Sequence, residues 1–518
     1  MPLAPLPLVA LFGALALQPL QHAPPRTPRS PRAPLVSMSA APGDQSEDDA
    51  TTPASNNRRR LLQGAAAALA ATAAPNSARA ELSPSTNWNL WPALPLAPYG
   101  KRKTLMREAV PGKVWTFDQL FGVFYVHVPI RMTVIAMESG GLFVYAPVAP
   151  TKECLALFQP LVDKYGPVRH VVLPSVAPEH KVLAGPFARA APCRGATFWT
   201  TDKQYSFPVN LPETFLGFPG EVRRLPPSSR GLDLRELGLG EFEFEVLTAK
   251  ASKESVYQEA AFFHKPTKSL LLCDAVVSTG IDPPEILLSE PEYRRALLYH
   301  ARDDPLEKVE DTPETWRKGW QRIALFGNFF QPGALVSLEN DRWLAAAPRS
   351  PMPELGWAGV LPFAWRDTTP VAFEAFRDGG KPVVVPIIQI ILSRAPDAAR
   401  KWVDVVTSWD FQRVLPAHFE TNLAVKPKEL RQAFAFLDEG KNSVRFCDED
   451  VAFLREALDS LPPDLALYDT PLGPLRGKAC GLERGQLADE GPNAKRYSMA
   501  EYSRAMAKVR GSGFRPLA

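Results

Sequence analysis

Three polar side chains follow apolar segments that are typical of buried strands. His180 comes shortly after the segment Val168–Leu173. His418 follows Phe411–Leu415 in a Pro-Ala-His sequence, and Asp274 directly follows four apolar residues. In open α/β sheets, ligands bind beyond the carboxyl ends of the strands. A carboxylate left unpaired beside a core costs several kcal/mol, so Asp274 requires a metal, a base or strong hydrogen-bond donors.

The other five of the seven histidines have no comparable placement. One lies in the N-terminal region, which carries no fold signal. The remaining four fall within predicted strands, beside a turn or inside a predicted helix, and we expect these four to be structural or exposed. The five residues are His22, His127, His170, His264 and His300.

The elements that must position the three polar residues alternate between strands and helices. Gly140-Gly141 marks one hairpin turn, and Lys265–Lys268 marks the hairpin that precedes Asp274. The apolar segment Val383–Leu392 is too short for a membrane span and is interpreted as a buried strand. Apolar spacing predicts helices at 152–164, about 180–190, 290–300, 314–330, 395–409, 427–437 and 449–460.

These signals predict an antiparallel-rich α/β domain over residues 113–440 with one large insertion at about 281–380. The Pro-rich segment 81–112 before it is expected to be an irregular arm. The segment 441–518 after it is expected to hold one helix and a loosely ordered tail, because its periodicity is weak.

The order of these motifs resembles that of the metallo-β-lactamase superfamily. In that superfamily a loop motif H-x-H-x-D-H, a later Asp and a His in a P-G-H-like turn hold two metal ions. More closely, the chain resembles the DUF4336 proteins of cyanobacteria, algae and plants over about residues 110–440. The segments that carry the resemblance are Arg131–Val134, Glu179–Lys181 with Gly185–Phe187, Phe262–Pro266, Trp316–Pro332 and Trp409–Phe419.

The resemblance implies a metallo-β-lactamase-like αββα sandwich with a large insertion, and it also implies a reduced metal site. Aligning Glu179-His180 with the D-H pair places Ser175 and Ala177 where the first two imidazoles would stand. The first metal site therefore lacks its imidazoles, whereas the second keeps its residue types. The metal ligands that the resemblance implies are Glu179, His180, Asp274 and His418.

Two functions follow from this site, and the sequence leaves both open. The leading hypothesis is a metal-dependent hydrolase of an unknown small molecule, in which one Zn²⁺, Fe²⁺ or Mn²⁺ activates water. The alternative is a pseudoenzyme without metal, whose carboxylates and imidazoles form buried hydrogen-bonded pairs. The protein would then bind or assemble a partner protein of the thylakoid lumen.

The first 80 residues resemble a targeting presequence. An apolar stretch at 3–18 is followed by a segment, 22–57, that is rich in Pro, Ser, Thr and Ala. The run Arg58–Arg60, an Ala-rich stretch and Ala78–Ala80 are the parts of a twin-arginine export signal. The combination predicts a chloroplast protein delivered to the thylakoid lumen, and the apolar start suits an alga with additional plastid membranes. The alternative is a low-complexity linker with chance arginines.

Composition excludes several classes of partner. Beyond residue 80 the chain has 52 basic and 52 acidic residues, so it lacks the basic excess that drives binding to nucleic acid. It contains no apolar run of 18 residues, so no transmembrane helix is predicted. The five cysteines form no C-x-x-C pair and are expected to be mainly buried thiols, although their number allows one disulfide.

Replacing Arg58, Arg59 and Arg60 with Lys is expected to stop passage into the lumen while import into the stroma continues. The physical reason is that the twin-arginine route recognises arginine rather than positive charge. Fractionation of plastids after import measures both steps. Undiminished delivery of the triple variant to the lumen would show that this segment is not an export signal.

Overall fold

The computed structural model describes residues 84–88, 101–123, 125–204, 213, 216–250, 256–329, 332–337, 345–355, 361, 363–438, 447 and 450. The predicted presequence at 1–80 lies outside these residues. Of the segment 441–518, with its predicted helix at 449–460 and its tail, only residues 447 and 450 are described. Among the described helices, none is both long enough and apolar enough to cross a membrane.

The first of two central sheets has seven strands in chain order. Its first four strands are antiparallel neighbours, and the pairs from β4 onward are parallel. The strands are β1 (Leu105–Val110), β2 (Val114–Val123), β3 (Val126–Ala136), β4 (Leu142–Tyr145), β5 (Val168–Leu173), β6 (Thr197–Thr200) and β7 (Arg223–Arg224).

The second sheet has four strands in the order β13-β10-β9-β8. β10 runs parallel to β13, whereas β9 is antiparallel to both of its neighbours. The strands are β8 (Phe242–Lys250), β9 (Val256–His264), β10 (Ser269–Leu272) and β13 (Arg413–Pro416). A separate two-stranded sheet pairs β11 (Leu335–Ser337) with β12 (Phe363–Trp365).

The two central sheets share an apolar core, because alternate residues of a strand point to opposite faces. On β4, Phe143 and Tyr145 belong to the cluster that β8, β9 and β10 also line. Their neighbours Leu142 and Val144 belong to a second cluster on the other face. The stacked pair Phe143–Phe242, with ring centroids 4.2 Å apart, joins the two sheets. Both faces of β4 are therefore buried, which explains its continuous apolar sequence.

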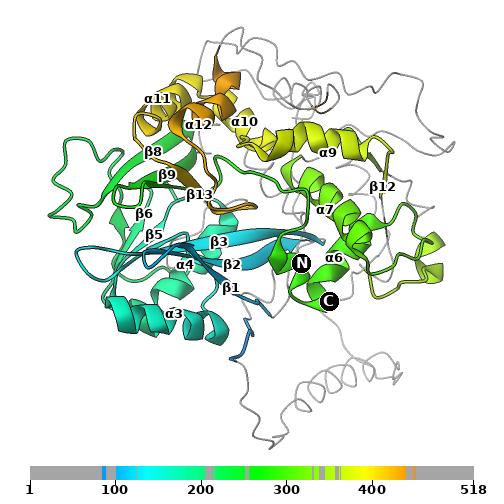
Figure 1. Ribbon diagram of the computed structural model, residues 1–518, viewed down its shortest axis with the longest axis horizontal. Coiled ribbons are helices and arrows are strands. Elements are labelled where there is room, and N and C mark those ends of the chain that lie inside the picture. The colour runs from blue at the N-terminus through cyan, green and yellow to red at the C-terminus, as the bar shows by residue number, and fades with distance from the viewer. Residues whose placement is uncertain are drawn as a thin grey trace, which may run out of the picture. The chain divides into compact units, whose positions relative to one another are not determined.

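Helices cover the outer face of each sheet. α3 (Lys152–Tyr165) and α4 (Pro178–Ala188) share the outer cluster of the first sheet. α10 (Pro386–Ser393), α11 (Pro396–Val406) and α12 (Pro427–Ala433) contribute to the cluster on the outer face of the second sheet. Figure 1 shows α3 and α11 on opposite sides of the strands. The layers run helix, sheet, sheet, helix, which confirms the predicted αββα sandwich.

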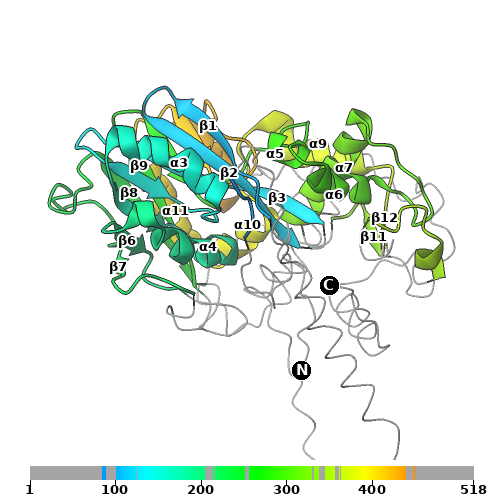
Figure 2. The ribbon, with the colours of Figure 1, turned by 90° about the horizontal axis from the view of Figure 1, so that it is seen from below.

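The described part of the segment predicted as an insertion includes the small sheet and several helices. Among these helices are α5 (Glu285–Leu288), α6 (Pro291–Ala301), α7 (Pro313–Asn328) and α9 (Thr369–Arg377). Figures 1 and 2 show α6, α7 and α9 together on one side of the two central sheets. Gly327 of α7 lies against Val126 and Val128 of β3, so these helices pack on the end of a long hairpin.

Two predictions of secondary structure are wrong. Val383–Leu392 is not a strand, because α10 begins at Pro386 and only Val383 forms an isolated bridge, with Val277. Proline is well suited to the first turn of a helix, and a short apolar run cannot by itself distinguish a buried helix from a buried strand. The arm predicted as irregular at 81–112 ends in β1, which pairs with β2.

The predicted state of the cysteines agrees with the structure. Cys154, Cys193 and Cys273 are buried free thiols. Cys447 is disulfide-bonded and is also buried, in the core cluster on the outer face of the second sheet. Burial raises the pKa of the Cys154 thiol to about 12, which makes it unreactive.

A buried arginine ties β3 to the segment that follows β13. Arg131 is 2% exposed and pairs with Asp118 of β2 through Nε and Oδ1 at 2.7 Å. It also donates hydrogen bonds to the carbonyl oxygens of Pro416 and Phe419, both at 2.8 Å. These two carbonyl groups flank His418, so the guanidinium group fixes the backbone on both sides of that residue.

Changing Arg131 to Met is expected to destabilise the fold by about 3 kcal/mol, because it leaves a buried carboxylate and two carbonyl oxygens without this donor. Urea unfolding of the full chain measures the change. The matched control is Arg107→Met, because Arg107 also pairs with Asp118 but its side chain is 37% exposed. That loss is expected to stay below about 1 kcal/mol. Equal losses in the two variants would contradict the role assigned to Arg131.

Candidate metal centre

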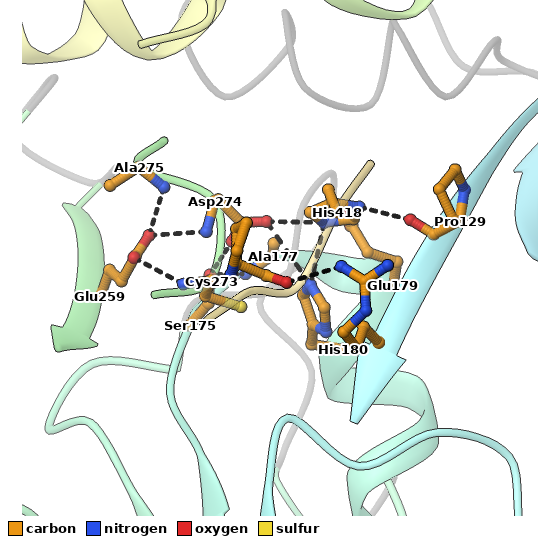
Figure 3. Close-up of polar contacts among 12 residues, drawn as sticks. Pro129, Ser175, Ala177, Glu179, His180, Glu259, Cys273, Asp274, Ala275 and His418 are labelled. Atoms are coloured by element: carbon orange, nitrogen blue, oxygen red, sulfur yellow. Dashed lines mark hydrogen bonds and ion pairs between the residues drawn. The ribbon is translucent and has the colours of Figure 1, made fainter. Parts of the chain in front are cut away.

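Four side chains from distant parts of the sequence meet at one edge of the two sheets. Glu179, His180, Asp274 and His418 are all buried, and each offers one donor atom within 4.8 Å of the other three. In Figure 3 the side chains of His180, Asp274 and His418 point toward one another. The structure therefore brings together all four residues that the sequence suggested as metal ligands.

Asp274 and His418 meet because their strands are parallel neighbours. In the register of β10 and β13, Leu272 lies opposite Pro416. Asp274 and His418 each stand two residues beyond that pair, so both leave the sheet at the same edge. The amide of Ala417 donates to the carbonyl of Leu272 at 3.0 Å, which extends the pairing toward the site.

Glu179 and His180 reach the same place from the first sheet. The loop after β5 pairs with β9 of the second sheet, through the amide of Ala260 and the carbonyl of Pro174 at 2.8 Å. α4 then begins with Pro178 in its first turn, a position that proline favours. Because Glu179 and His180 follow immediately, the start of α4 points both side chains toward the ends of β10 and β13.

The donor atoms are closely spaced. His418 Nε2 lies 3.0 Å from Asp274 Oδ1 and 3.1 Å from His180 Nε2. His180 Nε2 lies 3.5 Å from Asp274 Oδ1, and Glu179 Oε1 is 3.9 Å from His418 Nε2. The second oxygen of Glu179, Oε2, is buried and has no hydrogen-bond partner. A buried acceptor of this kind is costly unless something satisfies it.

The other ring nitrogen of His418 determines its tautomer. Nδ1 lies 2.9 Å from the carbonyl oxygen of Pro129, which can only accept a hydrogen bond, so Nδ1 must donate. A neutral His418 then carries its lone pair on Nε2, facing Asp274 and His180. A hydrogen bond from Nδ1–H to a carbonyl group is the usual arrangement of a metal-ligating histidine.

Burial and charge shift the pKa values of all four groups. Burial, and then the charge of Asp274, raise the pKa of Glu179 to about 8. Burial lowers the pKa of His180. Burial acts against the charge of Asp274 and of His418. Contact with His180, and then with His418, outweighs burial at Asp274 and lowers its pKa. Contact with Asp274 outweighs burial at His418 and raises its pKa.

A third carboxylate, which the sequence did not single out, holds the backbone next to the site. Glu259 of β9 is fully buried and accepts hydrogen bonds from the amides of Cys273, Asp274 and Ala275, each at 2.8 Å. The hydroxyl of Tyr257 donates to it at 2.6 Å. Burial, followed by the charge of Asp274, raises the pKa of Glu259 to about 7. A single acidic residue in a buried and mainly apolar strand was the signal that could have revealed it.

The four histidines expected to be structural or exposed prove to be buried. His170, for example, accepts a hydrogen bond from Trp199 Nε1 at 3.1 Å and lies 3.2 Å from the carbonyl oxygen of Gly238. His264 lies 2.8 Å from the hydroxyl of Thr267. These contacts are structural, because they hold strands and turns together.

Comparison with a family model identifies the matching family. The model described as "Domain of unknown function (DUF4336)" matches residues 111–436, which is more than half of the chain. None of the curated proteins compared with the chain matches it.

Several solved structures are similar to this chain at low identity. One is the DIM-1 metallo-β-lactamase exposed to ceftazidime, with 10% identity, a TM-score of 0.31 and coverage of 64% of this chain and 96% of that chain. Another is the metallo-β-lactamase from Pontibacter korlensis, with 16% identity, a TM-score of 0.25 and coverage of 34% and 73%. A third is the metal-soaked Flv1 flavodiiron core from Synechocystis, with 10% identity, a TM-score of 0.33 and coverage of 65% and 62%.

Changing Glu259 to Gln is expected to destabilise the fold by about 3 kcal/mol. The carboxylate now accepts hydrogen bonds from three backbone N–H groups, and the NH₂ group of Gln would instead place a donor against these donors. Urea unfolding of the full chain measures this loss. Glu243→Gln is the matched control, since Glu243 is only partly buried on the neighbouring strand β8. Its effect is expected to stay within about 0.5 kcal/mol. A similar loss in both variants would contradict the supporting role of Glu259.

Proposed function

This chain belongs to the DUF4336 family, and we propose that it is a metal-dependent hydrolase with a single divalent ion. The ligands are Glu179, His180, Asp274 and His418. The observation that supports this proposal is the convergence of four buried donors from three separate segments of the chain. Structural side chains without a common ligand have no reason to meet in this way.

The spacing of the donors fits one small ion. Atoms that each lie about 2.0–2.2 Å from a metal are separated from one another by about 3–4 Å. The distances among His180, Asp274 and His418 are 3.0, 3.1 and 3.5 Å, and Glu179 lies 3.9 Å from His418. Two imidazoles with two carboxylates suit Zn²⁺, Fe²⁺ or Mn²⁺. The buried, unpartnered Oε2 of Glu179 would also be satisfied by such an ion.

The chain's own groups prepare the site. The carbonyl of Pro129 holds the imidazole of His418 in the ligating tautomer. Glu259 fixes the backbone at Asp274, and the burial of all four ligands excludes bulk water from the immediate surroundings. When bound, the ion would supply Lewis-acid activation of water for hydrolysis. Esters, thioesters, phosphodiesters and lactams are the substrate classes to test.

A second candidate function rests on the contact between His418 and Asp274. If His418 carries a proton on both ring nitrogens, the same 3.0 Å distance is an ion pair that needs no metal. Contact with Asp274 raises the pKa of His418, which favours this arrangement. The protein would then be a pseudoenzyme that binds or assembles a partner.

The proposed location is the thylakoid lumen of a plastid. It is supported by the order of features in residues 58–80 of the sequence. The disulfide at Cys447 also suits a protein that leaves a reducing compartment.

The full chain, loaded with Zn²⁺, Mn²⁺ or Fe²⁺ and then dialysed, is expected to retain at most one ion per molecule by elemental analysis. His418→Ala and Asp274→Ala each remove one ligand, so each should weaken metal affinity by more than about tenfold. His170→Gln is the matched control, because it removes a buried imidazole away from the site and is expected to leave the affinity unchanged.

The outcomes separate the two candidate functions. Wild-type protein that retains no metal would overturn the hydrolase proposal and favour the ion-paired pseudoenzyme. Metal retention without turnover on any of the four substrate classes would leave a metal-dependent binding protein. Equal loss of metal in His170→Gln and His418→Ala would mean that the ion is bound elsewhere.

A further inference from the structure

We propose that Ser175 is a positioning residue that aims one oxygen of Asp274 at the metal. The inference rests on the proposed metal site and goes beyond it, because the ligands alone do not determine how the Asp274 carboxylate is turned. Ser175 is fully buried and lies 99 residues before Asp274 in the sequence.

The direction of each hydrogen bond at Ser175 follows from the chemistry of its neighbours. The hydroxyl Oγ contacts Oδ2 of Asp274, and an ionised carboxylate can only accept, so Ser175 donates. The same Oγ accepts a hydrogen bond from the amide of Ala177 at 3.1 Å. The amide of Ala177 therefore fixes the orientation of the hydroxyl group, whose proton points at Oδ2 of Asp274.

This hydrogen bond gives the two oxygens of the Asp274 carboxylate different partners. Oδ2 is occupied by the hydroxyl of Ser175, and Oδ1 faces His418 at 3.0 Å and His180 at 3.5 Å. Asp274 is thereby presented as a ligand through one oxygen. Without the hydroxyl, the carboxylate could turn about its last side-chain bond, because that torsion has a broad energy profile.

The backbone of Ser175 is held as firmly as its side chain. Ser175 forms an isolated bridge with Glu259 of β9, and the amide of Val176 donates to the carbonyl of Gln258 at 3.2 Å. Glu259 also accepts the amide of Asp274, so one strand fixes the backbone of both partners. The donor and the acceptor of the Ser175–Asp274 bond therefore share one rigid support.

Ser175→Ala is expected to weaken Zn²⁺ affinity by about 10- to 100-fold, the usual effect of losing a group that orients a ligand. Competition with a chromophoric chelator measures the affinity of the full chain. The visible absorption spectrum of the Co²⁺-loaded protein should also change, because it reports coordination geometry. Ser175→Thr keeps the hydroxyl and is expected to restore both the affinity and the spectrum.

Ser269→Ala is the matched control. Ser269 is also fully buried, with its hydroxyl bonded to Thr267, but it stands at the opposite end of β10 from Asp274. This variant should keep the wild-type affinity and spectrum, whereas a merely structural role for Ser175 would give the two alanine variants the same behaviour.

Failure of this inference is distinguishable from failure of the proposed function. Wild-type protein that binds no Zn²⁺ or Co²⁺ would overturn the metal site itself. Wild-type protein that binds metal, with Ser175→Ala equal to it in affinity and spectrum, would overturn only the role of Ser175. If Ser175→Ala does not fold, Ser175→Val, which has the shape of Thr but lacks the hydroxyl group, is compared with Ser175→Thr by the same criteria.

Discussion

The burial of the Asp274 carboxylate is the constraint on which the rest of the site depends. A charge in this position is stable only if it is paired and hydrogen-bonded. Its backbone amide is bonded to Glu259, Oδ2 to Ser175, and Oδ1 faces two imidazoles. These partners come from three separate segments of the chain, at 175–180, Glu259 and His418. Both sheets must therefore be in place before the charge is satisfied, so the fold and the site form together.

The topology explains why these segments are available at one point. Parallel pairing of β10 and β13 carries Asp274 and His418 to the same edge of the second sheet. The loop after β5 reaches that edge from the first sheet by pairing with β9. The seam where the two sheets join is thus also the place where the polar residues gather. The four candidate ligands are buried at this junction of the two sheets.

The sequence and the family resemblance together pointed to the four candidate ligands but not to the residues that support them. Polar groups directly after apolar strands stand out because the burial pattern changes abruptly there, as at Asp274 and His418. Glu259 was missed because it lies inside a strand and its partners follow 14 to 16 residues later. α10 was mistaken for a strand because its apolar run fits both periods. α10 begins at Pro386 because the fixed backbone angle of proline favours the first turn of a helix, and the pattern of apolar residues does not contain this preference.

The resemblance predicts imidazoles where Ser175 and Ala177 stand, and their absence does not argue against a metal site if Ser175 positions Asp274 as proposed. Ser175 cannot ligate as an imidazole does, but it holds the carboxylate that can. A pseudoenzyme that needed only an ion pair between His418 and Asp274 would gain little from a hydroxyl on the far oxygen. It would also gain nothing from the unpartnered carboxylate oxygen of Glu179, which is costly when buried. A single small cation accounts for both features, and for this reason the metal-bound state is the better explanation of the site.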